Sequence, residues 1–325
     1  MTQRDIFNIR SEGEFLSIAL SIFKYQYSNN LVYQEFCNHL NTNPEQVKAL
    51  NQIPFLPIQF FKQKKILSSV ETPKIIFTSS GTTGSATSKH YVTDLDLYTK
   101  SYGNTFKQFY GRPDEFCILA LLPSYLERGG SSLIYMVDDL IKKSNHPKSG
   151  FFLNDFQHLK ELLTLLEKSK TKTLLIGVSF ALLDFSEQYT LNLENTIIME
   201  TGGMKGRRKE MIRPELHSKL KQGFGVDKIH SEYGMTELLS QAYSKGNGVF
   251  NCPPWMKVLI RDTEDALSFK KHNSTGGLNV IDLANINSCS FIATQDLGKN
   301  YADGTFKILG RFDNSDIRGC NLMAL

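Results

Sequence analysis

Short apolar runs alternate with stretches of helical periodicity from residue 74 to about residue 245, and this alternation constrains the fold more than any other feature. The pattern predicts α/β units in which helices flank a largely parallel sheet. In open sheets of this kind ligands bind at the carboxyl ends of the strands, so the loops after the strands are the places to search. The expected strands are Lys74–Phe77, Phe116–Leu122, Thr173–Val178, Thr196–Met199 and Asp227–His230, and the expected helices lie near 93–110, 130–143, 154–168, 179–189 and 207–221.

The residues before this region show other patterns. Residues 12–41 have the apolar spacing of two amphipathic helices, and Asn43-Pro44 predicts the start of a short third helix. Residues 53–61 contain Pro54 and Pro57, which interrupt a helix, so we expect an extended segment there.

After residue 245 helical periodicity fades, and apolar runs separated by turn residues predict a β-rich subdomain or small barrel packed on the α/β part. The strands expected there are Met256–Ile260, Gly277–Asp282, Ser290–Thr294 and Thr305–Leu309. We therefore expect three regions, which are a helical segment at 1–73, an α/β core at 74–245, and a β-rich subdomain with a C-terminal tail at 246–325.

The bulk composition is that of a globular protein. The chain has 325 residues, of which 41% are hydrophobic, and its formal net charge of +4 gives no indication of nucleic-acid binding. No segment approaches the roughly 18 uninterrupted apolar residues of a membrane span, and the N-terminus lacks the apolar region of a signal peptide. The five cysteines are scattered without a C-x-x-C pair, which argues against a zinc site or a disulfide framework. We expect a cytoplasmic protein.

A loop rich in hydroxyl groups follows the first expected strand. The stretch from Thr78 to Lys89 consists mostly of Ser and Thr, with two glycines and a terminal lysine. Glycine lets the backbone approach a ligand closely, and N–H and O–H donors beside a lysine suit a polyphosphate. The spacing is not that of a Walker P-loop, and a solvated linker is the alternative. The candidate binding residues are Ser79, Ser80, Gly81, Thr82, Thr83 and Gly84, with Lys89 as a candidate for neutralising charge.

Two further loops follow expected strands. Gly202 and Gly203 form a pair that would let a flat ligand lie against the backbone, although a simple turn explains them as well. In the second loop, Tyr233 can pack on a base, Thr236 can donate to a phosphoryl oxygen, and the carboxylate of Glu237 can bind Mg²⁺. The alternative for this loop is a joint between a strand and a helix.

Two residues of the β-rich region are candidates for binding a sugar. Asp296 can accept hydrogen bonds from the two hydroxyls of a ribose, and Arg311 can make a two-pronged contact with phosphate or sugar. Asp296 stands two positions before Gly298 and Arg311 directly follows Gly310, so both also suit ordinary turns.

Taken in order, these loops resemble the adenylate-forming superfamily, which includes acyl- and aryl-CoA ligases, luciferases and the adenylation domains of peptide synthetases. The phosphate loop of that family is matched by residues 79–89, and its Tyr-Gly-x-Thr-Glu motif is matched by Tyr233, Gly234, Met235, Thr236 and Glu237. Its Thr-Gly-Asp element appears with Gln295 in place of glycine before Asp296. Its Gly-Arg element appears at Gly310-Arg311, with the following acid at Asp313.

The resemblance implies an N-terminal domain of the adenylate-forming type and activation of a carboxylic acid by ATP with Mg²⁺. It places residues 79–89 at the β- and γ-phosphates, Thr236 at the α-phosphate and Glu237 at the metal. The adenine would lie between Gly202, Gly203 and Tyr233, and Gly234 directly follows that tyrosine. The ribose would be held by Asp296 and Arg311. The mobile C-terminal domain of the family, which brings a catalytic lysine, has no counterpart in this sequence.

Within the superfamily, the sequence is most similar to the LuxE-like acyl-protein synthetases, which activate a fatty acid and then carry the acyl group on a cysteine near the C-terminus. Cys320, preceded by Arg318-Gly, matches that position, and a nearby guanidinium lowers the pKa of a thiol. A buried structural cysteine is the alternative. The acceptor would then be coenzyme A or a partner protein, and a third hypothesis is a non-catalytic nucleotide-binding partner of a reductase.

Overall fold

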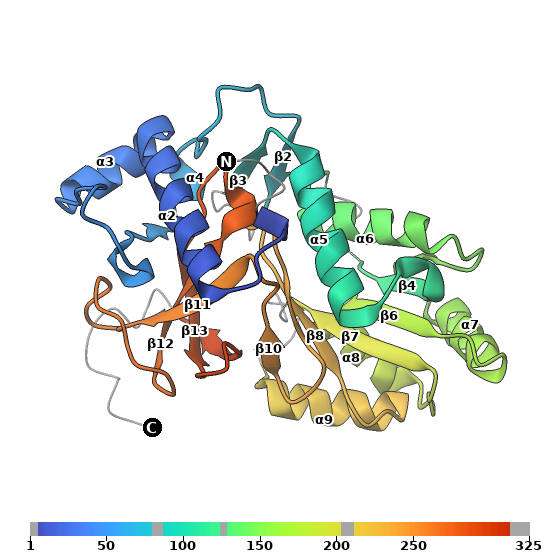
Figure 1. Ribbon diagram of the computed structural model, residues 1–325. Coiled ribbons are helices and arrows are strands. Elements are labelled where there is room, and N and C mark those ends of the chain that lie inside the picture. The colour runs from blue at the N-terminus through green and yellow to red at the C-terminus, as the bar shows by residue number, and fades with distance from the viewer. Residues whose placement is uncertain (1–5, 80–86, 124–128, 203–210, 313–325) are drawn as a thin grey trace.

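The computed structural model describes residues 6–79, 87–123, 129–202 and 211–312. Within these residues, one sheet of 12 strands runs through the molecule, and a separate two-stranded hairpin lies beside it (Figure 1). The sheet has a parallel half and a mostly antiparallel half, in the strand order β11-β12-β13-β14-β10-β9-β8-β7-β6-β4-β5. The twelfth strand, β1 (Leu56–Pro57), lies outside this order and pairs with β13.

The parallel half of the sheet is built from α/β units, as the alternating pattern predicts. Strands β4 and β6 are buried at every position, as is typical of parallel strands that helices cover on both faces. Helices α5 and α6 lie on one face, and α8 and α9 on the other (Figure 1). The strands are β4 (Cys117–Leu121), β5 (Gly150–Phe152), β6 (Thr173–Val178), β7 (Thr196–Thr201) and β8 (His230–Tyr233), and the helices are α5 (Leu95–Tyr110), α6 (Ser132–Ser144), α7 (Phe156–Lys168), α8 (Ser179–Gln188) and α9 (Arg213–Phe224).

The β-rich region expected after residue 245 is present, and its strands continue the same sheet. In the sheet order, β8, β9, β10 and β14 follow one another, and each pairs antiparallel with the next. The same holds from β14 through β13 and β12 to β11. The boundaries of the three expected regions stay a prediction. The strands are β9 (Ala242–Ser244), β10 (Val249–Asn251), β11 (Met256–Arg261), β12 (Thr275–Asp282), β13 (Phe291–Asn300) and β14 (Phe306–Arg311).

The N-terminal segment contains the two predicted helices, α2 (Glu12–Asn29) and α3 (Leu31–His39). Ser11 caps α2 by accepting from the backbone N–H of Glu14. The third helix predicted at Asn43-Pro44 is wrong, because the Asn43 side chain and carbonyl accept the N–H groups of residues 45 and 46 and close a single turn. The expected extended segment contains the short strand β1 (Leu56–Pro57), which is followed by α4 (Phe60–Gln63).

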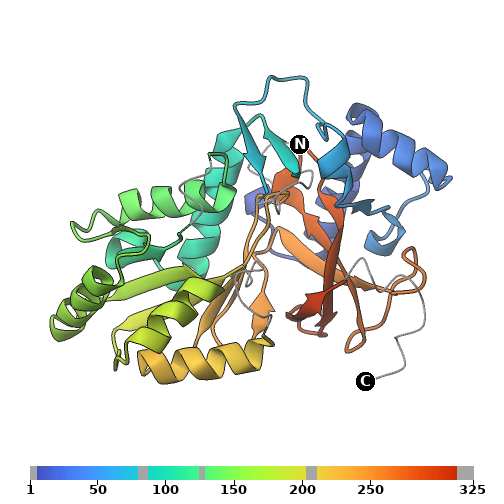
Figure 2. The same ribbon diagram turned by 180° about the vertical axis from the view of Figure 1, so that it is seen from behind.

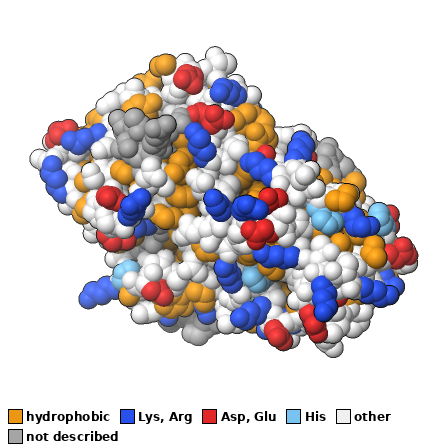
Figure 3. Space-filling model, turned by 45° about the vertical axis from the view of Figure 1, so that its right-hand side comes forward, with side chains coloured by type: hydrophobic (Ala, Val, Ile, Leu, Met, Phe, Trp, Pro, Cys, Tyr) orange, Lys and Arg blue, Asp and Glu red, His pale blue; other side chains and the backbone are white. Residues whose placement is uncertain are grey.

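The loop rich in hydroxyl groups joins the two strands of the hairpin, β2 (Ile75–Thr78) and β3 (Lys89–Val92). Thr78 pairs with Lys89 where the loop leaves the hairpin. The hairpin stands beside α5 and α4 when the molecule is seen from behind (Figure 2). The face of the molecule in Figure 3 carries basic and acidic side chains interspersed, in keeping with the small net charge.

Two buried amides of the N-terminal helices attach this segment to the β-rich region. The Gln26 side chain donates to the carbonyl oxygens of Asn285 and Ile286 and accepts from the backbone N–H of Ser290. Asn30 donates to the carbonyl oxygen of Ser288. Since both side chains are buried, removal of either would leave backbone groups without partners.

We predict that Gln26→Leu lowers the free energy of unfolding by about 2–4 kcal/mol, because several buried polar groups lose their partner at once. Urea denaturation followed by circular dichroism measures the change. Gln108→Leu is the matched control, since Gln108 is exposed on α5 and its replacement should change stability by about 0.5 kcal/mol or less. Equal effects of the two substitutions would contradict the role of Gln26.

Candidate active site

The site is built at the carboxyl edge of the parallel half of the sheet. Strands β7 and β8 are neighbours there, and Thr201 pairs with Glu232, so the next residues, Gly202 and Tyr233, follow side by side. Gly202 has φ +69° in the left-handed region, where glycine is favoured, and it is exposed. The expected strand Asp227–His230 is displaced, since β8 covers His230–Tyr233, and Tyr233 therefore ends a strand instead of lying in the loop.

Tyr233 is hydrogen-bonded to the sugar-binding candidates of the β-rich region. Its hydroxyl donates to Oδ2 of Asp296 over 2.8 Å, and Nε of Arg311 lies 3.2 Å from Oδ1 of the same carboxylate. Asp296 and Arg311 are opposite each other on β13 and β14, so both stand within strands and not in the turns suggested by the neighbouring glycines. Asp296 is buried, whereas the Arg311 side chain is 71% exposed. The guanidinium is therefore accessible to a ligand.

The ring of Tyr233 is packed among other aromatic rings. Its centroid lies 6.1 Å from that of Phe250 and 5.7 Å from that of Phe306, both at steep angles. Burial and the carboxylate of Asp296 raise the pKa of Tyr233 well above its usual value, so the hydroxyl keeps its proton and acts as a donor. These contacts fix the position of the Tyr-Gly-x-Thr-Glu motif at its first residue.

His90 attaches the hairpin to the other end of the motif. Its Nδ1 lies 2.8 Å from the carbonyl oxygen of Thr236, and its Nε2 lies 2.9 Å from Oδ1 of Asn285. Nδ2 of Asn285 in turn donates to the carbonyl oxygen of Glu237. Burial lowers the pKa of His90 to about 4, so the ring is neutral near pH 7.

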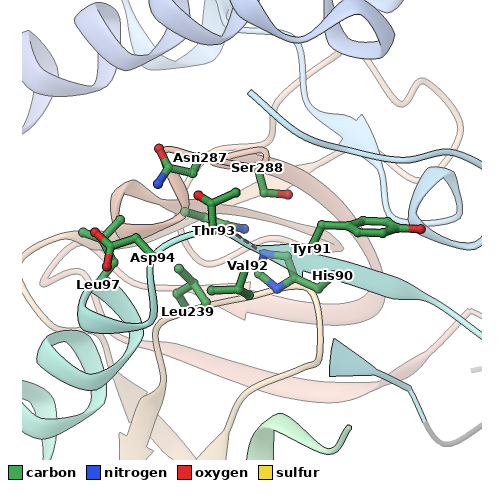
Figure 4. Close-up of a pocket in the computed structure, with 10 residues that line it drawn as sticks. His90, Tyr91, Val92, Thr93, Asp94, Leu97, Leu239, Asn287 and Ser288 are labelled. Carbon is green, nitrogen blue, oxygen red and sulfur yellow. Dashed lines mark hydrogen bonds between the residues drawn. The ribbon is translucent and has the colours of Figure 1, made fainter. Parts of the chain in front are cut away.

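A small cavity lies beside His90 and Thr93 and is also lined by Asn285 of η3 (Leu283–Asn285) and by Asn287 and Ser288 of the segment that follows it (Figure 4). Its volume of about 10 Å³ is roughly the room that one water molecule needs. The hydroxyl of Thr93 is buried and, within the described part of the chain, has no hydrogen-bond partner. A buried water molecule would satisfy it, and the cavity is too small for a substrate.

Glu237 lies under the hairpin and is 5% exposed. Burial raises the pKa of its carboxyl group, while a hydrogen bond from Ser88 and the charges of Arg311 and Lys62 act in the opposite direction. No group of three or more His, Cys, Asp or Glu side chains able to hold a metal occurs among the described residues. A single carboxylate fits Mg²⁺ that also binds phosphate, because Mg²⁺ in nucleotide sites is commonly held by one or two carboxylates and by the phosphates.

The predicted site residues that the structure describes fall into two groups. Buried side chains fix the geometry, and the accessible groups that they position are Ser79, Lys89, Gly202, Gly234, Thr236 and Arg311, all of them exposed or half-buried. Ser79 closes the base of the loop, since its hydroxyl accepts from the backbone N–H of Ser88. The remaining predicted residues lie outside the described residues, and they are Ser80, Gly81, Thr82, Thr83, Gly84, Gly203 and Cys320.

Two buried carboxylates at the same edge were not among the predicted residues. Glu200 lies 3.2 Å from Nε of Arg213 and 3.5 Å from Nε2 of His217. Although its burial acts against ionisation, these partners hold its pKa below the usual value. Glu232 accepts from the hydroxyl of Thr201, and burial raises its pKa to about 7. The only signal in the sequence was their place, with Glu200 two positions before the glycine pair and Glu232 directly before Tyr233.

The other four cysteines are poor nucleophiles. Burial raises the pKa of Cys37, Cys252 and Cys289 to about 12 each and raises that of Cys117 as well. A thiol in such surroundings stays protonated near pH 7. Among the helices of the described residues, moreover, we find none with the length and apolar character that crossing a bilayer requires.

The fold is shared with solved structures of acyl-CoA ligases. A 2-hydroxyisobutyryl-CoA ligase in complex with 2-HIB-AMP and CoA superimposes with a TM-score of 0.65 at 12% identity, over 93% of this chain and 70% of the ligase. ATP-bound MatB from Rhodopseudomonas palustris gives a TM-score of 0.56 at 18% identity, over 73% of this chain. The matched region spans about half of MatB, at 47% of its length. These likenesses confirm the predicted fold class.

The sequence comparisons identify the family. A long-chain-fatty-acid–luciferin-component ligase of Vibrio harveyi is 23% identical over 324 residues, which cover 92% of this chain and 84% of that protein. The family model of the acyl-protein synthetase LuxE matches residues 11–324. These matches confirm the predicted resemblance and the predicted enzyme class, an ATP-dependent acid–thiol ligase. The chain belongs to the LuxE family of acyl-protein synthetases.

Proposed function

We propose that the protein activates a fatty acid with ATP to give an acyl-adenylate and pyrophosphate, and then transfers the acyl group to a thiol. The observation that carries the proposal is the gathering of three separate segments at one edge of the sheet. Tyr233 is hydrogen-bonded to Asp296, and His90 of the hairpin is hydrogen-bonded to the carbonyl oxygen of Thr236. The motif therefore stands between a candidate sugar site and a candidate phosphate loop.

In this proposal the nucleoside lies along the ends of β7 and β8. Gly202, Gly203 and Tyr233 bracket the adenine, since an exposed glycine at the strand end leaves room for a flat ring. Asp296 and Arg311 hold the ribose hydroxyls, because the carboxylate accepts hydrogen bonds and the guanidinium donates them. The hydroxyl of Tyr233 keeps the Asp296 carboxylate in place for this contact.

The triphosphate then extends toward the hairpin. The loop of residues 79–89 binds the β- and γ-phosphates, Thr236 donates to the α-phosphate, and Lys89 neutralises part of the charge. Mg²⁺, when bound, would be held by Glu237 and the phosphates, and it would supply positive charge to the phosphoryl oxygens. Glu237 is suited to this role because its carboxylate lies beside Ser88 at the base of the loop.

Activation requires little covalent work from the protein. A carboxylate oxygen of the acid attacks the α-phosphorus, the bond from that phosphorus to the β-phosphate oxygen breaks, and its electron pair leaves with pyrophosphate. Rate then comes from positioning and from neutralising charge in the transition state. The name of the Vibrio harveyi relative, a long-chain-fatty-acid ligase, supports a fatty acid as the substrate.

Acyl transfer is the second step. We assign the acceptor thiol to Cys320, because the four other cysteines are buried or half-buried with raised pKa values. The thiolate attacks the carbonyl carbon, AMP leaves, and a thioester forms on the protein. Transfer to coenzyme A or to a partner protein is the alternative that the Cys320 substitution below distinguishes.

Exchange of labelled pyrophosphate into ATP, with a panel of carboxylic acids of increasing chain length, tests the activation step. We predict that Glu237→Gln lowers the exchange rate about 100-fold or more, since a metal contributes several kcal/mol to stabilising such a transition state. Glu161→Gln is the control, because Glu161 is exposed on α7. Normal exchange by folded Glu237→Gln would exclude the metal role, and no exchange with any acid would exclude the activity.

The raised pKa of Glu237 predicts the pH dependence of metal binding. Only the ionised carboxylate binds Mg²⁺, and burial moves its protonation to a higher pH than that of an ordinary glutamate. The Mg²⁺ concentration for half-maximal exchange should therefore rise as the pH falls, beginning above the ordinary glutamate pKa of about 4.3. A titration of Mg²⁺ at several pH values measures this, and a requirement independent of pH would contradict it.

Cys320→Ser should abolish the accumulation of a hydroxylamine-sensitive acyl group on the protein while leaving pyrophosphate exchange unchanged. Labelled fatty acid with ATP, followed by gel autoradiography, measures the thioester. Cys252→Ser is the control, since Cys252 is half-buried with a raised pKa. Undiminished labelling of Cys320→Ser would show that the acceptor assignment is wrong.

A further inference from the structure

Helix α4 is held against the candidate site by contacts on both sides. Just before it, β1 pairs in parallel with β13, and the backbone N–H of Ile58 donates to the carbonyl oxygen of Ala293. On the other side, Phe61 is buried, and its ring centroid lies 6.0 Å from that of His90 in an edge-to-face contact. Figures 1 and 2 both show α4 beside the hairpin. The helix is therefore fixed between β13, which carries Asp296, and β3.

This attachment fixes the position of the Lys62 backbone. Lys62 directly follows Phe61, and His90 connects Phe61 to the carbonyl oxygen of Thr236, the residue before Glu237. The side chain of Lys62 is exposed, and in the described residues no carboxylate oxygen lies within 4.0 Å of its ammonium. Its positive charge nevertheless acts on the carboxylate of Glu237, as does the charge of Arg311.

An exposed lysine contributes little to folding, yet the charge of this one acts on Glu237, beside which the phosphates of ATP lie in the proposed function. An ammonium on a flexible stem can follow a phosphate group as it moves away from the α-phosphorus. Two other lysines near α4 have different surroundings. Lys65 stands over the ring of Tyr91 at 5.5 Å, and Lys64 is the C-cap residue that follows the helix.

We propose that Lys62 is a catalytic residue that binds the β- and γ-phosphates of ATP and the departing pyrophosphate. The inference rests on the proposed function. As the carboxylate oxygen bonds to the α-phosphorus, the bond to the bridging oxygen breaks and its electron pair stays on pyrophosphate. Lys62 keeps its proton throughout and donates hydrogen bonds to the phosphate oxygens, which carry more charge as the bond breaks.

Pyrophosphate exchange by Lys62→Met and Lys62→Arg, with the best acid of the panel, tests this role. We expect Lys62→Met to lower kcat/KM for pyrophosphate about 10- to 100-fold, and Lys62→Arg to recover most of that loss because it restores a donating cation. Lys64→Met is the matched control, since it removes the same charge from the residue directly after the same short helix, and it should change kcat/KM less than about 2-fold.

The outcomes separate the inference from the proposed function. If the unmodified protein exchanges pyrophosphate and Lys62→Met does so equally well, the inference is overturned and the function stands. Equal losses in Lys62→Met and Lys64→Met would also overturn it, because they would indicate a general effect of surface charge. Failure of the unmodified protein to exchange with any acid would overturn both. Thermal melts of each variant verify folding, and Lys62→Gln replaces the methionine variant if that variant is destabilised.

Discussion

The hydrogen bond from Tyr233 to Asp296 is the contact on which the arrangement of this site depends. It joins the last parallel strand to β13 of the antiparallel half, 63 positions further along the chain. Arg311 is held to the same carboxylate from the neighbouring strand. Because Tyr233 and Asp296 are both buried, the bond forms in surroundings where an unpaired carboxylate would be costly. One polar contact therefore fixes the position of the end of β8 relative to two strands of the β-rich region.

A second contact, that of His90 with Thr236, fixes the opposite end of the motif. Burial keeps the imidazole neutral, and its two ring nitrogens contact the carbonyl oxygen of Thr236 and Oδ1 of Asn285. The five-residue motif is thus held at both ends, and its exposed or half-buried members between them face outward. In our account the N-terminal segment takes part too, since α4 packs against the same histidine.

Much of this architecture could be predicted from the sequence because the parallel strands are apolar and short. Strand β6 has the expected bounds, since every residue from Thr173 to Val178 is buried. The prediction failed where polar residues continue a strand, as at Ser231 and Glu232 of β8 and at Asp296 of β13. Whether these residues extend a strand is determined by pairing with a neighbouring strand, and no local sequence pattern reveals that pairing. The role of His90 was missed for the same reason, because its partners lie 146 and 195 positions away.

The account depends most on attack at the α-phosphorus by the acid, and isotope transfer tests that step directly. The protein is given ATP, Mg²⁺ and the best acid of the panel with both carboxylate oxygens labelled as ¹⁸O, and the AMP released after acyl transfer is analysed by mass spectrometry. Our account predicts one ¹⁸O atom in each AMP, since the attacking oxygen stays on phosphorus when the thiol takes the acyl group. Unlabelled AMP, or label in inorganic phosphate with formation of ADP, would contradict it.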